Sequence, residues 1–217
     1  MNISVSILIP TYQMGKFVAR AIRSALHQSF PSEKYEIVVI DDGSTDNTSR
    51  VLQSFGNDIK IITHEENKGL AAARNTGLRA ARGRYVVNLD ADDYIHHDLI
   101  NIQHTFLTLD PWIDAVSCDY YIVDEREAHM ERKSAEEFPI ACGIMFRIDQ
   151  LINIGLYDED FLAREEEDVR IRFLEEYSIY NIPLPLYRYR QHGKNLTKNK
   201  ELMKEQMIKL NNKHSLS

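Results

Sequence analysis

Aspartates gather in two short turns of this chain, each directly after a run of apolar residues. Residues 41–46 read Asp-Asp-Gly-Ser-Thr-Asp and follow the run 36–40, and residues 90–93 read Asp-Ala-Asp-Asp and follow the run 84–89. Acidic side chains at the ends of buried strands do little for packing. They are well suited to hold a cation and a ligand that carries phosphate.

The second turn brings two carboxylates together. In an extended chain, residues two apart project from the same face, so the side chains of Asp90 and Asp92 are expected to meet. Two such charges about 4 Å apart repel by roughly 4 kcal/mol at an effective dielectric constant near 20, and a divalent cation removes this repulsion. Oxygen ligands suit Mg²⁺ or Mn²⁺. A solvated acidic turn is the alternative, but three aspartates within four residues beside a buried strand favour the metal site.

The first turn has a partly structural explanation. Ser44 or Thr45 can cap the helix expected next, and Asp46 is favourable near the positive end of that helix. Asp41 and Asp42 are not needed for this purpose. At the end of a strand, they are placed to accept hydrogen bonds from the base or the ribose of a nucleotide.

Strand-like and helix-like segments alternate through the first part of the chain. Nearly continuous β-branched runs predict buried strands, and the segments between them are long enough for crossover helices. The pattern predicts an α/β fold with a Rossmann-like, doubly wound, mostly parallel sheet and helices on both faces. Ligands of such folds bind beyond the carboxyl ends of the strands, where both acidic turns fall. The expected strands are 5–9, ended by Pro10, then 36–40 and 84–89, and the expected helices are 16–28, 46–55 and 70–82, the last capped by Gly83.

Size and composition limit the classes of protein. A chain of 217 residues suits one compact domain, and the net charge of −7 argues against binding to nucleic acid. No apolar run approaches the roughly 20 residues of a membrane span, and the start lacks the basic region of a signal peptide, so a cytoplasmic location is expected. Cys118 and Cys142 have no metal-site spacing and are interpreted as small core residues.

The C-terminal tail, residues 193–217, differs from the rest in charge. From Lys194 onward it has six lysines and two glutamates, and Met203, Met207 and Leu210 fall on one helical face. The preferred interpretation is a terminal helix that packs on the core. The alternative is contact with an anionic membrane surface or with a partner, which would place the protein at the inner face of the plasma membrane.

Five motifs follow in an order that resembles glycosyltransferase family 2. They are Ile9-Pro10-Thr11-Tyr12, residues 39–46, residues 67–69 with 73–77, Gly83-Arg84-Tyr85, and residues 89–93. The resemblance is close up to about Leu99 and looser beyond. It implies a GT-A-type fold that binds a nucleotide-diphosphate sugar, usually with a divalent metal, and transfers the sugar with inversion. The expected halves are about 1–115 for the nucleotide sugar and about 116–192 for the acceptor.

The resemblance also implies roles for individual residues on the donor side. Pro10, Thr11 and Tyr12 resemble the first loop that contacts the nucleotide, and Asp42, with Asp41 beside it, resembles the carboxylate that recognises the base. Asp90 resembles the acid on the ribose side, and Asp92 the metal ligand, with Asp90 as a second candidate ligand; the duties of Asp90, Asp92 and Asp93 are not divided further. Arg74 matches a position near the nucleotide, although its alanine-rich helix is equally consistent with tight packing alone.

The catalytic base is assigned to Asp168. Inverting transfer needs a base on the acceptor side, and residues 163–169 resemble the Glu-Asp motif that carries the base in the family. The alternative is structural, because Glu166 with Arg170, and Asp168 with Arg172, have the spacing of ordinary helix ion pairs.

A late cationic face is expected near the diphosphate. Residues 184–192 alternate, which places Arg188, Arg190 and His192 on one face of a strand. Arg190 is a candidate for binding the diphosphate, and His192 resembles the late histidine that completes the metal or phosphate site in many GT-A enzymes. The alternative is an exposed edge strand. The charged segment 124–137 is expected to be a mobile loop over the acceptor side.

The sequence therefore predicts a metal-dependent inverting glycosyltransferase that uses Mn²⁺ or Mg²⁺. The expected donor is a nucleotide sugar, with a uridine nucleotide favoured by family tendency, and the expected acceptor is a glycan or a lipid-linked acceptor in cell-envelope or capsular polysaccharide synthesis. Two alternatives stay open. One is a non-catalytic nucleotide-sugar-binding module, and the other is a sugar nucleotidyltransferase, whose usual glycine-rich first loop is replaced here by Pro10-Thr11-Tyr12-Gln13.

Overall fold

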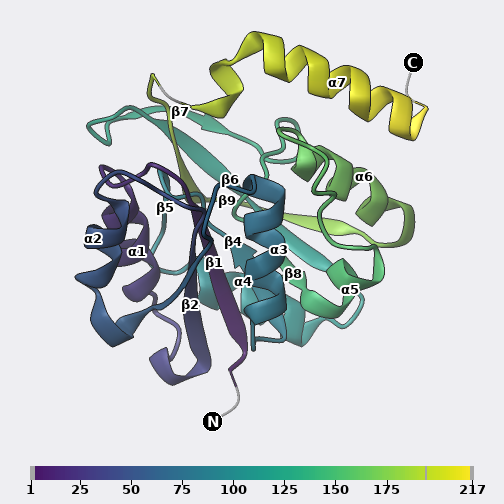
Figure 1. Cartoon of the computed structure of the whole chain (residues 1–217). Coiled ribbons are helices and arrows are strands. Elements are labelled where there is room, and N and C mark those ends of the chain that lie inside the picture. Colours follow the sequence, from purple (N-terminus) through teal and green to yellow (C-terminus); the bar gives the residue numbers. More distant parts are fainter. Residues whose placement is uncertain (1–2, 194, 216–217) are drawn as a thin grey trace.

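The computed structural model describes residues 3–193 and 195–215. Lys194, where the predicted basic segment begins, lies outside the described residues. Helices pack on both sides of a curled mixed sheet, and the C-terminal helix lies across one end of the molecule (Figure 1). Within the described residues, no helix is long and apolar enough to cross a membrane.

One nine-stranded sheet runs through the molecule in the order β3-β2-β1-β4-β8-β6-β9-β5, and β7 pairs with β6 outside this path. Strands β3, β2, β1 and β4 are parallel, whereas β8 runs antiparallel to both β4 and β6. The strands are β1 Val5–Thr11, β2 Tyr35–Asp41, β3 Lys60–Thr63, β4 Tyr85–Asn88, β5 Tyr94–Ile95, β6 Ala115–Val123, β7 His129–Lys133, β8 Met145–Arg147 and β9 Ile179–Arg190.

Helices cover both faces of this sheet. Side chains alternate along β1, so that Ile7 and Ile9 pack on one face with α1, α2 and α4, whereas Leu8 packs on the other face with α3, α5 and α6. The α-helices are α1 Val18–Leu26, α2 Thr48–Gln53, α3 Leu70–Ala80, α4 Leu99–Leu109, α5 Ile148–Asn153, α6 Glu165–Glu176 and α7 Lys200–His214. The predicted α/β fold with helices on both faces is confirmed. The parallel strands are β1 to β4 in the first half of the chain, together with the pair β6 and β9 in the second half.

Strand β1 continues through Pro10 to Thr11, whereas the sequence predicted an end at Pro10. The carbonyl of Leu8 accepts from the amide of Leu89, so residue 10, two further on, faces the same side of the strand. On that side β4 has already ended at Asn88, and the missing amide hydrogen of Pro10 therefore breaks no sheet hydrogen bond.

Gly83 is required for close approach and not as the predicted helix cap. Helix α3 ends before Ala81, which is extended at φ −67° and ψ 140°. A Cβ at Gly83 would lie 2.6 Å from the amide nitrogen of Ser6 and 2.8 Å from the carbonyl oxygen of Tyr85. The glycine lets the chain enter β4 directly beside β1.

The charged segment 124–137 is largely a hairpin and not the expected loop. Strand β7 pairs antiparallel with β6, which brings the tip of the hairpin over α1. There Glu125 accepts from Lys16 at 2.6 Å and Glu127 accepts from Arg20 at 3.0 Å. The charges of this segment thus serve in part as ion pairs with α1 and with Lys16 just before it.

Helix α7 packs on the core, as preferred from the sequence. Leu210 is buried, and the side chain of Gln206 accepts from the amide of Leu162 at 3.1 Å. Arg164, just before α6, donates to the carbonyl of Met203 at 3.1 Å. The contacts join α7 to the start of α6, and Figure 1 shows α7 above α6 at one end of the sheet.

Candidate active site

The second acidic turn lies directly after β4, at the carboxyl edge of the parallel strands. One carboxylate oxygen from each of Asp90, Asp92 and Asp93 lies within 4.8 Å of the other two. Asp93 is buried, whereas Asp90 and Asp92 are partly exposed, with 28% and 14% of their side chains accessible. The predicted meeting of Asp90 and Asp92 is therefore found.

Electrostatics make this turn favourable for a cation. Burial raises the pKa of Asp92, and the neighbouring Asp90 raises it further, although His192 acts in the opposite direction. Burial also raises the pKa of Asp93 well above its ordinary value, with contributions from Asp92 and Asp90. Several carboxylates that resist ionisation together are stabilised in their charged form by a divalent ion. The oxygen donors fit Mn²⁺ or Mg²⁺.

The carboxylate of Asp93 is hydrogen-bonded to other residues of the protein. It accepts from the hydroxyl of Tyr187 at 2.7 Å and from the backbone amide of Arg190 at 2.7 Å. These bonds tie the turn to β9, which the sequence did not indicate. The structure thus divides the three acids: Asp93 fixes the turn, and Asp90 and Asp92 are left as the candidate metal ligands.

His192 and Arg190 both reach the acidic turn. His192 is buried, its ring stacks on Phe17 at 4.7 Å, and its Nε2 lies 2.8 Å from the carboxylate of Asp92. The guanidinium of Arg190 donates to the carbonyl of Asp92 at 2.7 Å and to Glu127 at 3.1 Å. Arg190 does not lie on an exposed edge strand, because β9 runs between β6 and β5, and His192, just beyond the end of β9, is buried. Arg190 supports the shape of the turn, and its charge is already paired.

Arg74 connects the acidic turn to α6. This fully buried side chain donates to Asp90 at 3.2 Å and forms an ion pair with Glu165, the first residue of α6. Burial raises the pKa of Glu165 to about 7, against the opposing effect of Arg74 and with a further increase from Glu166. The sequence prediction missed Glu165. A buried arginine needs a carboxylate partner, but no local spacing shows which acid supplies it.

The predicted nucleotide loop lies at the same sheet edge. Thr11 is buried, and its hydroxyl finds no hydrogen-bond partner among the described residues, whereas Tyr12 is 42% exposed. Asp41 accepts from the amide of Ser44 at 3.1 Å. Pro10 is buried at the end of β1.

Both carboxylate oxygens of Asp42 are bonded to the protein. They accept from His64 Nδ1 at 2.6 Å and from the amides of Lys68 and Gly69, each at 2.9 Å. Asp42 thereby holds residues 64–69 in front of α3. Its role in base recognition stays a prediction, and its visible role is to shape the loop.

Asp168 lies where α6 meets α7. It is fully buried, and its carboxylate accepts from Arg172 at 2.6 Å, from Lys213 at 2.6 Å and from His214 at 2.8 Å. Burial acts to raise the pKa of Asp168, but the hydrogen bonds from Lys213, Arg172 and His214 lower it below the ordinary value. These contacts support the structural alternative, because a base needs access to an acceptor and free affinity for a proton.

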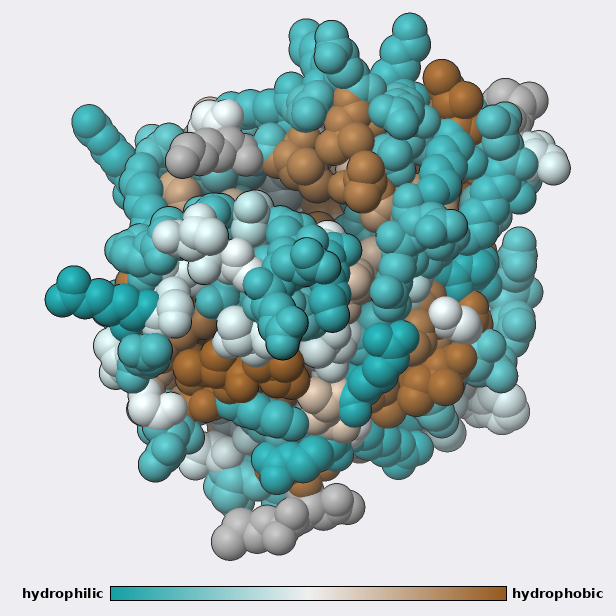
Figure 2. Space-filling model, viewed as in Figure 1, coloured by the Kyte–Doolittle hydropathy of each residue, from teal (hydrophilic) through white to brown (hydrophobic). Residues whose placement is uncertain are grey.

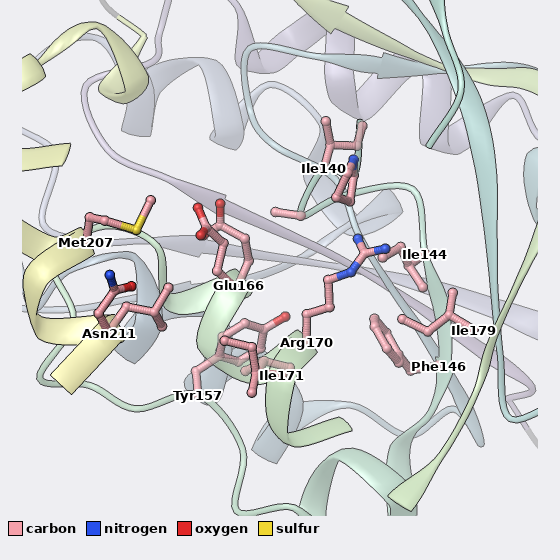
Figure 3. A pocket seen from close by; sticks show the side chains of 15 residues that line it. Ile140, Ile144, Phe146, Tyr157, Glu166, Arg170, Ile171, Ile179, Met207 and Asn211 are labelled. Atoms are coloured by element: carbon pink, nitrogen blue, oxygen red, sulfur yellow. The ribbon is translucent and has the colours of Figure 1, made fainter. Parts of the chain in front are cut away.

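Glu166 instead faces a cavity. A pocket of about 450 Å³ lies between α6, α7 and the segment 139–146, and Glu166 and Arg170 are among its lining residues. Figure 3 shows both side chains extending from α6, Glu166 on the side of Met207 and Arg170 on the side of Ile144. The ion pair expected between them is absent from the described structure, in which neither side chain has a carboxylate or cationic partner within 4.0 Å. The sequence prediction treated Glu166 only as half of that pair.

Comparison with known families identifies the group to which these features belong. Residues 6–166 match the model described as Glycosyl transferase family 2. The chain belongs to this family.

This family 2 chain is similar to longer proteins. It is 30% identical over 211 residues to the protein described as uncharacterized glycosyltransferase RP339 of Rickettsia prowazekii, covering 89% of this chain and 65% of that protein. It is 39% identical over 100 residues to chondroitin synthase of Escherichia coli, covering 45% of this chain and 14% of that protein. The chain spans between 29% and 65% of the length of the Rickettsia relatives.

Solved structures share the fold. The crystal structure of Staphylococcus aureus TarS residues 1–349 superposes with a TM-score of 0.80 at 21% identity, over 96% of this family 2 chain and 64% of that chain. The mannosyltransferase PcManGT from Pyrobaculum calidifontis, in complex with GDP-Man and Mn²⁺, gives a TM-score of 0.76 at 20% identity, over 100% of this chain and 65% of that chain. The predicted GT-A-type fold is confirmed.

Proposed function

We propose that this chain transfers one sugar from a uridine-diphosphate sugar to an acceptor hydroxyl, with inversion and with Mn²⁺ or Mg²⁺. The observation that carries the proposal is the connection between two sites. Asp90 and Asp92 form an acidic pair at the carboxyl edge of the sheet, and Arg74 joins Asp90 to the start of α6, where Glu166 faces a pocket. This connection supports a donor site and an acceptor site that adjoin.

The donor side is built to receive a diphosphate. When a divalent ion is bound by Asp90 and Asp92, it supplies positive charge that stabilises the leaving diphosphate. His192 and Arg190 orient the turn that carries these carboxylates. The TarS neighbours include complexes with UDP and with UDP-GlcNAc, which supports a uridine nucleotide, whereas PcManGT was solved with GDP-Man.

We assign the base to Glu166 in place of Asp168. In the transfer, the acceptor oxygen forms a bond to the anomeric carbon, its proton passes to the Glu166 carboxylate, and the bond from that carbon to the diphosphate oxygen breaks. The attack comes from the side opposite the leaving group, so the configuration inverts. Glu166 is partly exposed and unpaired among the described residues, whereas the carboxylate of Asp168 is already bonded to Arg172, Lys213 and His214.

A panel of nucleotide sugars tests the proposal. With Mn²⁺ present, a UDP sugar should release UDP slowly in the absence of acceptor, and Asp92→Asn should abolish this release. The matched control is Asp110→Asn, which changes an exposed aspartate at the end of α4. A protein that binds UDP with Mn²⁺ but releases no nucleotide from any sugar donor is the binding module instead.

The wider setting stays a prediction. A cytoplasmic location, a role in envelope or capsular polysaccharide synthesis, and membrane contact through residues 193–217 rest on the sequence and on the family. The packing of α7 is compatible with membrane contact, because Met207 and Ile208 remain 37% and 55% exposed.

A further inference from the structure

The pocket beside Glu166 has walls that suit an apolar ligand. Its volume of about 450 Å³ lies within the usual range for sites that bind small molecules. Most of the lining residues are apolar, among them Ile140, Ile144, Phe146, Val169, Met207 and Leu210. Figure 2 shows apolar residues reaching the surface beside α7, among hydrophilic neighbours. A sugar alone would fit these apolar walls poorly, because its hydroxyl groups need polar partners.

One cation is placed in this apolar lining. Arg170 extends into the pocket, and burial lowers the pKa of its guanidinium, with no opposing contribution from a carboxylate. Within the described residues it forms no hydrogen bond and no ion pair, unlike Arg164 and Arg172 on the same side of the molecule. A half-buried guanidinium without a counter-charge binds a phosphate strongly, because its planar donors match the phosphate oxygens.

One wall of the pocket contacts the donor side. Tyr157 forms part of this wall, and its hydroxyl accepts from the side chain of Asn88 at 2.9 Å, the residue that ends β4. The guanidinium of Arg74 lies 5.4 Å from the centre of the Tyr157 ring. A ligand held in the pocket therefore ends close to the reacting groups.

We propose that this pocket holds the lipid end of the acceptor: an apolar chain that carries a phosphate, with the phosphate bound by Arg170 and the chain against Ile144, Phe146, Met207 and Leu210. Its description as an acceptor site rests on the proposed function, but the binding of a lipid phosphate does not. Glu166, the proposed base, lies one helical turn before Arg170. Its negative charge repels the phosphate, so the phosphate stays at Arg170.

Calorimetric titration with decyl phosphate, below its critical micelle concentration, tests the inference. Decyl phosphate should bind at least about tenfold more tightly than inorganic phosphate or decanol, because both halves of the ligand are used. Arg170→Gln should weaken binding of decyl phosphate about tenfold, and Arg170→Lys should restore part of the affinity. Arg50→Gln, an exposed arginine of α2 on the opposite face of the sheet, is the matched control and should bind as the wild type does.

The apolar part of the site has its own variant. Met207→Gln keeps the shape of the side chain and should weaken binding of decyl phosphate, with little effect on inorganic phosphate. Met130→Gln, on the exposed strand β7, is its control. Equal affinity for decyl phosphate and inorganic phosphate overturns the inference, as does equal affinity of Arg170→Gln and Arg50→Gln.

The result separates this inference from the proposed function. Binding of decyl phosphate that depends on Arg170, in a protein that releases no UDP from any donor, supports the lipid-phosphate site and overturns the transferase proposal. Manganese-dependent release of UDP without binding of decyl phosphate overturns the lipid-phosphate site and leaves the transferase proposal intact.

Discussion

At the scale of single residues, the acids of this chain differ in what they can do. Asp93 and Asp168 are buried, and their carboxylates are already hydrogen-bonded to other residues of the protein. Asp90, Asp92 and Glu166 keep accessible oxygens. Accessibility, and not the sequence motif alone, separates the acids that can bind a ligand or take a proton from those that hold the fold.

Glu166→Gln should affect the transfer rate, whereas Asp168→Asn should affect the stability of the fold. Glu166→Gln should lower the transfer rate about 10²–10⁴-fold with unchanged donor binding and stability, because it removes only the proton acceptor. Asp168→Asn should destabilise the fold by about 2–4 kcal/mol, because Arg172, Lys213 and His214 lose their shared carboxylate. Transfer assays and urea denaturation measure the two effects. Full transfer by Glu166→Gln would return the base to another residue.

Mn²⁺ should stabilise the wild type against heat. A ligand that binds only the native state adds about 2.7 kcal/mol at a concentration 100 times its dissociation constant. Asp92→Asn should lose most of this increase, whereas Glu131→Gln, an exposed acid of β7, should keep it. Differential scanning fluorimetry with and without EDTA is the measurement. An equal rise in melting temperature for both variants would contradict the assignment of the acidic turn.

At the scale of elements, α6 and α7 are joined by charge. The carboxylate of Asp168 on α6 is bonded by Lys213 and His214 near the end of α7, 46 residues away in the case of His214. A second ion pair, from Lys213 to Asp158, lies beside it at 2.8 Å. Helix α7 forms part of the pocket wall, so these ion pairs also determine the shape of the proposed acceptor site.

The stability that Asp168 contributes should depend on pH. Its pKa in the folded protein lies below the ordinary value of 3.8, so its contribution is fully present above that value and is lost as the pH falls through the folded pKa. The difference in unfolding free energy between wild type and Asp168→Asn should therefore shrink as the pH falls from about 5 to below about 4. Urea denaturation across this range measures it. A difference that grows toward acid would show that the folded pKa is raised instead.

Helix α3 packs on the sheet at Gly77. A Cβ at this position would lie 2.8 Å from the Cδ1 of Ile40 and 3.1 Å from a methyl of Leu8. Gly77→Ala should destabilise the protein by roughly 1–3 kcal/mol, because overcrowding a packed core outweighs the higher helix propensity of alanine. Ala80→Gly, near the end of the same helix and only partly buried, gives the propensity effect without the clash. Thermal unfolding compares them, and a stabilised Gly77→Ala would contradict the close packing.

At the scale of the whole molecule, the sequence predicted the first half better than the second. Up to β4, each strand is followed by its own helix, so local apolar patterns determine both the elements and their parallel order. Strand β8 has only three residues, and no local pattern reveals it. The alternation of residues 184–192 indicated a strand, but it did not show that β9 pairs with β6 and β5 from distant parts of the chain. The same limit applies to the site. The two-residue spacing of Asp90 and Asp92 was sufficient to predict that their carboxylates meet. Which face of α6 meets the pocket could not be predicted, because it depends on the packing of α7.

The two halves meet at Arg74, and this contact should be visible as a coupling free energy. Asp90 and Glu165 share one buried guanidinium, so each single change, Asp90→Asn or Glu165→Gln, leaves Arg74 with one carboxylate. The double change leaves a buried cation without a counter-charge, and it should destabilise the fold by roughly 1–3 kcal/mol more than the sum of the single changes. Urea denaturation at about pH 8, above the pKa of Glu165 at about 7, measures the coupling, which should weaken as the pH falls through that value.

The exposed Glu159 pairs instead with Arg79, so Asp90→Asn combined with Glu159→Gln should be additive. Additivity in both cycles would mean that Arg74 does not couple the acidic turn to α6.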